Sequence, residues 1–257
     1  MDLDQSLDTL LRALLEEAGR PVVLPESHAE RRKLLRALMN IRPPKPIDPE
    51  LLALQDAILQ EELSHKPVAD AAGLPPSPLD SRLSLWQGDI TLLRCDAIVN
   101  AANSALLGCF LPLHNCIDNA IHSAAGIQLR LACHALMEAQ GHEEPPGRAK
   151  LTPGFQLPAR YVIHTVGPAV RGELTQAHRD ALASCYRSCL ELAEAHALER
   201  VAFCCISTGV YGFPPGQAAP IAVDTVRQTL DRCPHVKQVV FNVFTDSDLA
   251  LYRALLG

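Results

Sequence analysis

The sequence predicts a three-layer α/β domain with a largely parallel or mixed sheet, preceded by a small helical extension. Two observations lead to this prediction. From Arg82 onward, short apolar runs alternate with segments of helical periodicity, a pattern typical of a sheet covered by helices. The first eighty residues differ, because they hold ten of the twenty prolines but only two of the fourteen glycines. With 48% hydrophobic and 20% charged residues, the chain can form a substantial core, which excludes a disordered or fibrous protein.

The extension is expected to contain three helices. Leucines recur at helical spacing between positions 3 and 15, and Gly19 provides a stop signal. A second helix is predicted over 29–39, before a cluster of prolines, and a third over 51–63. Residues 65–79 contain four prolines and are therefore predicted to form a linker.

We divide the chain into an extension, residues 1–80, and an α/β domain, residues 81–257. Apolar runs predict strands over 83–86, 97–99, 161–166, 201–206 and 239–243. Helical patterns lie between them, over 117–125, 128–140, 176–195 and 217–230. In such sheets ligands bind beyond the carboxyl ends of the strands, which is where the unusual residues of this chain fall.

Charge and composition exclude several classes of function. The net charge of −6 and a pI near 5.9 do not show the excess of basic residues that is typical of a nucleic-acid-binding protein. No apolar run approaches the roughly 18 residues of a membrane helix, and the first residues are acidic where a signal peptide is basic. Nine cysteines form no regular framework, so we expect reduced thiols in a cytoplasmic protein, some of them able to bind metal.

Two asparagines and an aspartate lie near predicted strand ends. Asp89 can accept hydrogen bonds from an exocyclic amine or cap a helix, and Asn100 and Asn103 can bond ribose hydroxyls through donor and acceptor. The alternative is ordinary turn chemistry, because Gly-Asp and Asn are common turn residues.

A second segment, residues 207–216, follows the predicted strand 201–206. Gly209 and Gly212 let backbone amides point into a concavity, as phosphate binding requires. Ser207 and Thr208 add hydroxyl donors, and Tyr211 can lie against a sugar. The alternative is a plain loop before the next helix.

Cys109, His114 and Cys116 form the most specific group. Two thiolates and an imidazole within eight residues suit Zn²⁺, and three protein ligands leave one position open for water or substrate. Because positions 114 and 116 point to different sides of a helix, both can meet one metal only in a loop or first turn. The alternative is three unrelated residues in an apolar loop.

A helix is predicted from about Asn115 to Gly126, with Asp118 in its first turn. A carboxylate there can be catalytic or can simply complement the helix dipole. We interpret His122 and His164 as core residues.

Together these segments resemble the macrodomain family, which binds ADP-ribose. The similar strings, in the family's order across 82–257, are GDITLLRCDAIVNAANSALLG, CIDNAIHSAAG, YVIHTVGP and CISTGVYGFPPGQAA. The resemblance implies a three-layer α/β/α fold with a mixed central sheet and an ADP-ribose cleft at the strand ends. Many macrodomains have a run of glycines before the Asp-containing helix, where this chain has residues 108–116. That departure resembles the zinc-dependent macrodomains, which carry a helical extension and remove ADP-ribose from proteins.

The resemblance implies one Zn²⁺ per chain on Cys109, His114 and Cys116. Asp89 would hold the adenine amine with Ile90 beside it, and Asn103 would bond the distal ribose, with Asn100 structural. Asn103 and Asp118 are the predicted catalytic residues, and Phe244 is a candidate for stacking on adenine. The full predicted ADP-ribose set is Asp89, Ile90, Asn103, Cys116, Ile117, Asp118, Ser207, Thr208, Gly209, Val210 and Tyr211.

The expected function is a zinc-dependent hydrolase of glycosidase type that releases mono-ADP-ribose from an acidic side chain of a modified protein. The resemblance suggests a lipoyl-carrier protein, modified by a sirtuin-like transferase, as the substrate. From charge and hydropathy we expect neither nucleic acid nor membrane as a partner. One alternative is a non-catalytic module that reads ADP-ribose. Another is a structural zinc domain whose extension binds a partner. The extension itself could cover the cleft, bind protein or stabilise the domain.

Overall fold

The computed structural model describes residues 3–257 and contains a six-stranded sheet in the order β2-β8-β7-β4-β6-β5. All neighbouring strands are parallel except β5 and β6, so the sheet is mixed, as predicted. Its strands are β2 (Leu83–Gln87), β4 (Ala97–Ala102), β5 (Ala149–Pro153), β6 (Tyr161–Val166), β7 (Arg200–Phe203) and β8 (Gln238–Val243).

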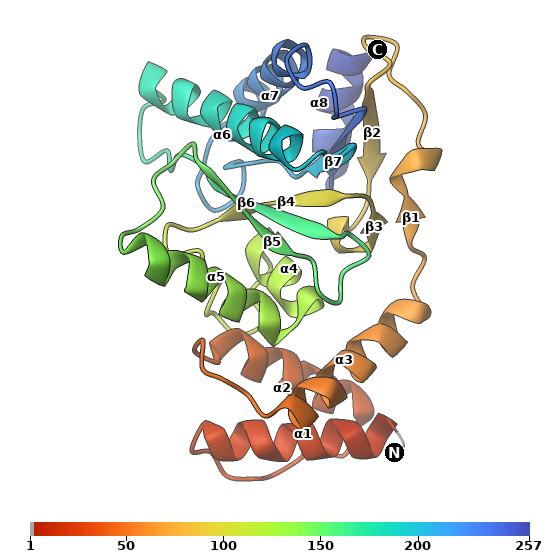
Figure 1. Ribbon diagram of the computed structural model, residues 1–257, viewed down its shortest axis with the longest axis vertical. Helices are drawn as coiled ribbons and strands as arrows, with labels where there is room; N and C mark the ends of the chain where they lie inside the picture. Colours follow the sequence, from red (N-terminus) through yellow and green to blue (C-terminus); the bar gives the residue numbers. More distant parts are fainter. Residues whose placement is uncertain (1–2) are drawn as a thin grey trace.

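Helices cover both faces of this sheet and complete the predicted three layers. Figure 1 shows α4 and α5 on one face and α6, α7 and α8 on the other. Their bounds are α4 (Ile117–Ala125), α5 (Ile127–Gln140), α6 (Gln176–Ala195), α7 (Pro215–Leu230) and α8 (Asp246–Leu256). The central strands β4 and β7 are buried on both faces, which explains why they read as continuous apolar runs.

The extension folds into three helices, α1 (Leu3–Glu17), α2 (His28–Ile41) and α3 (Pro49–Ser64). Their leucines form a hydrophobic cluster separate from the main core, to which the following domain contributes Ile127 and Leu131. Helix α2 packs on α4, so the extension lies against the same face of the sheet as α4 and α5 (Figure 1).

The predicted linker contains short regular segments. Strand β1 (Ala69–Asp70) pairs in parallel with β3 (Leu93–Arg94). The 3-10 helix η1 (Ala71–Gly73) follows Asp70 within the linker, and a second one, η2 (Ile90–Leu92), follows Asp89 in the domain. The linker therefore runs along the domain and is fixed to it.

Some element boundaries differ from the predictions. Strand β4 continues to Ala102, whereas β7 ends at Phe203, so residues 204–206 already belong to the following loop. Helix α4 spans 117–125, the range of the predicted helical pattern, and not the longer range from about Asn115, because Cys116 is its N-cap. Strand β5 and helix α8 were not predicted from the sequence.

These two omissions have physical reasons. Strand β5 contains Lys150 and Pro153, which an edge strand tolerates and a buried strand does not. Helix α8 follows β8 after a connection of two residues without Gly or Pro, so no breaker signal separates the two elements, although Thr245 accepts the Asp248 N–H as an N-cap. Within the described residues, no helix is long and apolar enough to span a membrane, and all nine cysteines are free thiols.

Gly126 is expected to be indispensable where α4 meets α5 and the extension. Its φ of 95° and ψ of 177° are accessible essentially to glycine alone, and an added Cβ lies 2.5 Å from Gln55 Nε2. Gly126→Ala should therefore lower the free energy of unfolding by about 1–3 kcal/mol, measured by chemical denaturation. Gly73→Ala is the control, because its backbone is ordinary and nothing lies within 4 Å. Equal stability of the two variants would contradict this role.

Candidate functional site

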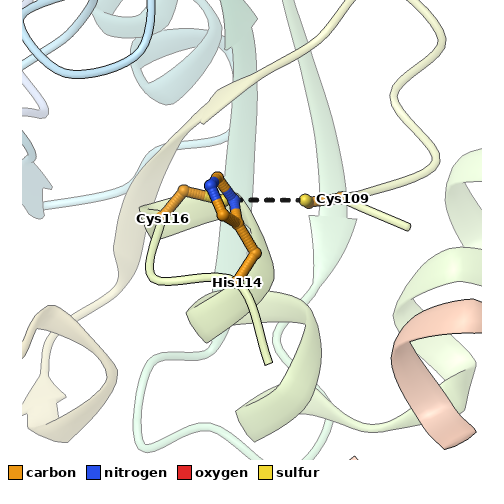
Figure 2. Close-up of side chains that lie close together, drawn as sticks. All are labelled: Cys109, His114 and Cys116. Atoms are coloured by element: carbon orange, nitrogen blue, oxygen red, sulfur yellow. Dashed lines mark hydrogen bonds between the residues drawn. The ribbon is translucent and has the colours of Figure 1, made fainter. Parts of the chain in front are cut away.

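The loop between β4 and α4 brings Cys109, His114 and Cys116 together. Cys109 Sγ lies 3.4 Å from His114 Nδ1, and the ligand atoms of all three residues lie within 4.8 Å of one another. Figure 2 shows His114 and Cys116 at the end of the loop, with Cys109 facing the His114 ring. Cys116 is the N-cap of α4, with Sγ 3.5 Å from the Asn119 amide. The three residues thus meet in a loop and at the start of a helix, as the spacing requires.

The donor set of this cluster fits a zinc ion. Two sulfurs and one imidazole nitrogen are ligands that Zn²⁺ prefers, and all three side chains are half-buried. Burial, helped by the nearby Cys109 sulfur, raises the pKa of the Cys116 thiol to about 11, although the Asn119 amide opposes the rise. The metal-free protein therefore holds Cys116 as a neutral thiol at pH 7, and metal binding would release its proton.

Asp118 lies in the first turn of α4, buried beside this cluster. Its Oδ1 accepts a hydrogen bond from Asn100 Nδ2 at 2.9 Å, and Asn103 Nδ2 lies 3.4 Å from its Oδ2. Burial raises the pKa of Asp118 to about 6, although the Asn100 bond and the nearby Arg130 charge oppose the rise. The two amides thus hold a carboxylate in place away from bulk water.

Asn103 has a second task in the same loop. Its Nδ2 donates to the Gly108 carbonyl at 3.0 Å, and its Oδ1 accepts from the Ala105 amide at 3.1 Å. The turn chemistry considered for this asparagine is therefore real, and it places the side chain between the cysteine loop and Asp118.

Asn100 differs from the expectation of a residue at a strand end. It lies inside β4, fully buried, opposite His164 of β6. Its Nδ2 is 2.9 Å from Asp118 Oδ1 and 3.2 Å from His164 Nδ1. Asn100 is buried inside the sheet, and its side chain contacts the predicted catalytic carboxylate directly. A polar residue within a buried strand was the available signal.

His164 stands behind Asn100 in the core. Since Asn100 Nδ2 donates to Nδ1, the Nε2–H faces Thr152 Oγ1 at 2.9 Å and Cys133 Sγ at 3.6 Å. Burial lowers the pKa of His164 to about 3 and lowers that of His122 well below its usual value. Both histidines are therefore neutral core residues, as predicted, and His122, 3.5 Å from Asp118 Oδ1, forms no charged pair with it.

The loop after β7 presents backbone amides. Ser207 is buried with a positive φ of 65°, and within the described residues the amides of 207–211 donate no hydrogen bond. The Thr208 hydroxyl donates to the Cys205 carbonyl at 3.0 Å, so it is used within the loop. The Val210 side chain is exposed and Tyr211 is half-buried. The backbone amides and the Ser207 hydroxyl, which has no hydrogen-bond partner within the part of the chain that the structure describes, therefore remain available for an anion.

Asp89 follows β2 and is the N-cap of η2. Its Oδ1 caps η2, accepting from the Thr91 amide at 3.0 Å and the Thr91 hydroxyl at 2.7 Å, which leaves Oδ2 free to accept a bond. The Ile90 side chain is buried in the core, so its backbone alone can face a ligand. Phe244, just after β8, is exposed.

A cavity of about 190 Å³ opens beside Asp89, between the domain and the extension. Its wall includes Thr91 and Ala120 of the domain and Arg32 and Arg36 of α2. The sequence left open whether the extension covers the cleft, but it did not single out Arg32 and Arg36, because contacts between distant helices leave no local pattern.

Comparison with known proteins identifies the fold and the family. A model of the macro domain matches residues 99–222. A protein-ADP-ribose hydrolase of Staphylococcus aureus is 51% identical over 237 residues, which is 92% of this chain and 88% of that protein. The chain belongs to the macrodomain family.

Two further relatives of this macrodomain are informative. A Trypanosoma brucei macrodomain, solved in complex with ADP-ribose, is 32% identical with a TM-score of 0.67 and spans 87% of this chain and 95% of its own. A Fusarium oxysporum protein, described as a probable bifunctional ADP-ribose hydrolase/ADP-ribosyltransferase, is 44% identical over 87% of this chain but only 40% of its own length.

His164 is expected to make the stability of the macrodomain sensitive to acid. The unfolded chain binds a proton at His164 near pH 6.5, whereas the folded protein does so only near pH 3. Stability is therefore lost as the pH falls below 6.5, by about 1.4 kcal/mol per pH unit for this one group. Denaturation at pH 7.5 and 5.5 should show that His164→Gln loses less stability on acidification than wild type. The exposed His142→Gln should behave as wild type, and an equal loss in all three proteins would contradict the prediction.

Proposed function

We propose that this macrodomain is a zinc-dependent hydrolase that removes mono-ADP-ribose from modified protein side chains. The observation that supports it best is the convergence, at the start of α4, of the buried Asp118 carboxylate and the Cys109–His114–Cys116 cluster. The 51% identity to a protein-ADP-ribose hydrolase supports the same reaction class. The proposed linkage is an ester between the distal ribose and an acidic side chain, which makes the enzyme a glycosyl hydrolase.

Cys109, His114 and Cys116 would hold the metal. When bound, zinc would supply a Lewis acid able to hold a water molecule or the ribose hydroxyls. Two thiolates weaken its acidity relative to neutral ligands, so positioning of the ribose carries at least as much weight as activation of water.

The residues of the chain would orient ADP-ribose along the site. Asp89 Oδ2 accepts from the adenine amine, and the free amides of 207–211 donate to the pyrophosphate. Asn103, with Ile117 and Cys116 nearby at the start of α4, adjoins the distal ribose. The anomeric carbon is thereby directed toward Asp118.

Asp118 would then act as general base. Water attacks the anomeric carbon while the bond from that carbon to the side-chain carboxyl oxygen breaks, passing through an oxocarbenium-like state. The departing carboxylate keeps the bonding electron pair, and Asp118 accepts the proton of the water. The amides of Asn100 and Asn103 hold the carboxylate oxygens during this transfer, and free ADP-ribose is released.

The proposed substrate is a lipoyl-carrier protein modified by a sirtuin-like transferase. The Fusarium relative, whose description combines hydrolase and transferase activities, supports a link with a transferase. Hydrolysis of the modified carrier, compared with an unrelated ADP-ribosylated protein, tests this choice. A non-catalytic reader is the alternative, but a reader of ADP-ribose does not require a buried carboxylate beside a metal-binding cluster.

The purified macrodomain is expected to contain one zinc ion per chain by elemental analysis. Cys109→Ala or Cys116→Ala should remove it, because two remaining ligands rarely hold zinc tightly. Cys233→Ala is the control, because this buried thiol lies outside the cluster and its loss should leave the zinc content unchanged. If elemental analysis of carefully prepared wild-type protein finds no zinc, the proposal of zinc dependence is wrong.

Asp89 is expected to contribute to the affinity for ADP-ribose. Because Asp89 also caps η2, Asp89→Asn is the sharper change: its amide oxygen can keep the cap, while the second acceptor is lost. Both Asp89→Ala and Asp89→Asn should weaken binding by about 1–3 kcal/mol in calorimetry. Thr91→Val keeps the carboxylate and should bind nearly as wild type. Unchanged affinity in Asp89→Asn would remove this carboxylate from the adenine site.

Asp118 and Asn103 are expected to affect turnover more than binding. Asp118→Ala should slow single-turnover hydrolysis by roughly 10²–10⁴-fold with zinc content unchanged, because the general base is lost. Asn103→Ala should also lose turnover while ADP-ribose still binds. Glu50→Ala is the control, since this exposed carboxylate in the first turn of α3 can act only on helix stability. A zinc-loaded Asp118→Ala protein that hydrolyses at the wild-type rate would show that another group accepts the proton.

A further inference from the structure

The loop that carries Cys109, His114 and Cys116 has little internal support. Between β4 and α4, its own backbone bonds include Leu106 N to the Asn103 carbonyl and His114 N to the Leu111 carbonyl. Leu106 and Leu113 have positive φ values of 56° and 57°, a conformation that leucine adopts at a cost. Such a backbone persists only when its surroundings hold it in place.

Asn40, near the end of α2, supplies one such contact. Its side chain is 1% exposed, and its Oδ1 accepts the Leu113 N–H at 3.0 Å. Its Nδ2 donates to Ser123 Oγ of α4 at 3.0 Å. Asn40 therefore connects the residue before His114 to the helix that Cys116 caps.

Arg36, one turn earlier on α2, makes a second connection. Its Nη2 donates to Asn119 Oδ1 at 2.9 Å and lies 3.5 Å from the carbonyl oxygen of His114 itself. Asn119 is fully buried, and its Nδ2 donates to the Leu111 carbonyl at 3.0 Å. Residues of α2 therefore bind backbone groups of loop residues 113 and 114 directly, and they reach the carbonyl of residue 111 through Asn119 of α4.

Arg130 of α5 connects the end of α2 to the first part of the loop, residues 107–110. It donates to the Met39 carbonyl at 2.9 Å and to the Leu107 carbonyl at 2.6 Å, and its guanidinium lies 4.3 Å from the centre of the Phe110 ring. Arg130 is 5% exposed. The segment on each side of Cys109 is therefore tied to the end of α2.

We propose that Asn40 and Arg36 of the extension are positioning residues for the metal-binding loop. They hold the backbone of 111–114 in the one arrangement in which His114 meets the two cysteines. The inference deepens the proposed function, because it assigns the extension a role in metal affinity and turnover. It excludes a purely stabilising role for these two side chains.

Amide hydrogen exchange of the metal-free protein tests the contact without reference to zinc or turnover. Asn40→Leu removes the acceptor for Leu113 N–H, so exchange at Leu113 and His114 should accelerate by about tenfold or more, while amides of β4 and α6 keep wild-type rates. Asn40→Asp keeps an acceptor oxygen and should restore protection. Gln60→Ala is the matched control, because Gln60 joins the extension to Gln156 away from the loop.

Zinc affinity, measured by competition with a chelator, tests the consequence. Asn40→Leu should bind zinc about 10–100-fold more weakly, as is typical when outer partners of metal ligands are lost, and Asn40→Asp should lie close to wild type. If Asn40→Leu does not fold, Arg36→Met tests the same loop from a half-buried position. Wild-type exchange at Leu113 and His114, or wild-type zinc affinity, in the folded loop variant would overturn the proposal. A wild-type protein that binds no zinc defeats the proposed function, whereas the exchange rates still decide whether α2 holds the loop.

Discussion

The hydrogen bond from Asn100 Nδ2 to Asp118 Oδ1 joins a central strand to the first turn of a helix, and the site is arranged around it. A buried carboxylate without hydrogen bonds is too costly to keep charged, so its partners fix where α4 can begin. That start in turn places Cys116 as the N-cap and determines where the loop from β4 must end. The sheet, the helix and the cysteine cluster are therefore connected through one pair of side chains.

The polar groups around Asp118 are mostly neutral. Asn100 and Asn103 donate to its oxygens, and the histidines behind them are uncharged because burial lowers their pKa. Hydrogen bonds from amides stabilise the charge without forming a tight ion pair. A carboxylate held in this way stays able to exchange a proton, because no permanent positive charge binds it directly.

Local patterns in the sequence were enough for the central strands, most helices and the cysteine cluster. The apolar run 161–166 and the close spacing of Cys109, His114 and Cys116 each involve neighbouring residues. Strand β5 was not predicted because it has few apolar residues of its own and is stabilised by pairing with β6. Asn40 and Leu113 are 73 positions apart in the sequence, and no local sequence pattern near either residue indicates their contact. Sequence therefore predicts which residues carry chemistry better than it predicts which residues hold them in place.

The extension has its own hydrophobic cluster, to which the domain adds only Ile127 and Leu131, and it shares directional polar contacts with the domain. Leucines within the extension constrain mainly one another, so over evolution they can exchange for other apolar residues as a group. Asn40 and the loop it holds have no such freedom, since a change in either removes the geometry that the other requires. In related chains, we expect the buried leucines of the extension to vary among apolar residues. The residue at the position of Asn40 should change only together with the loop between β4 and α4.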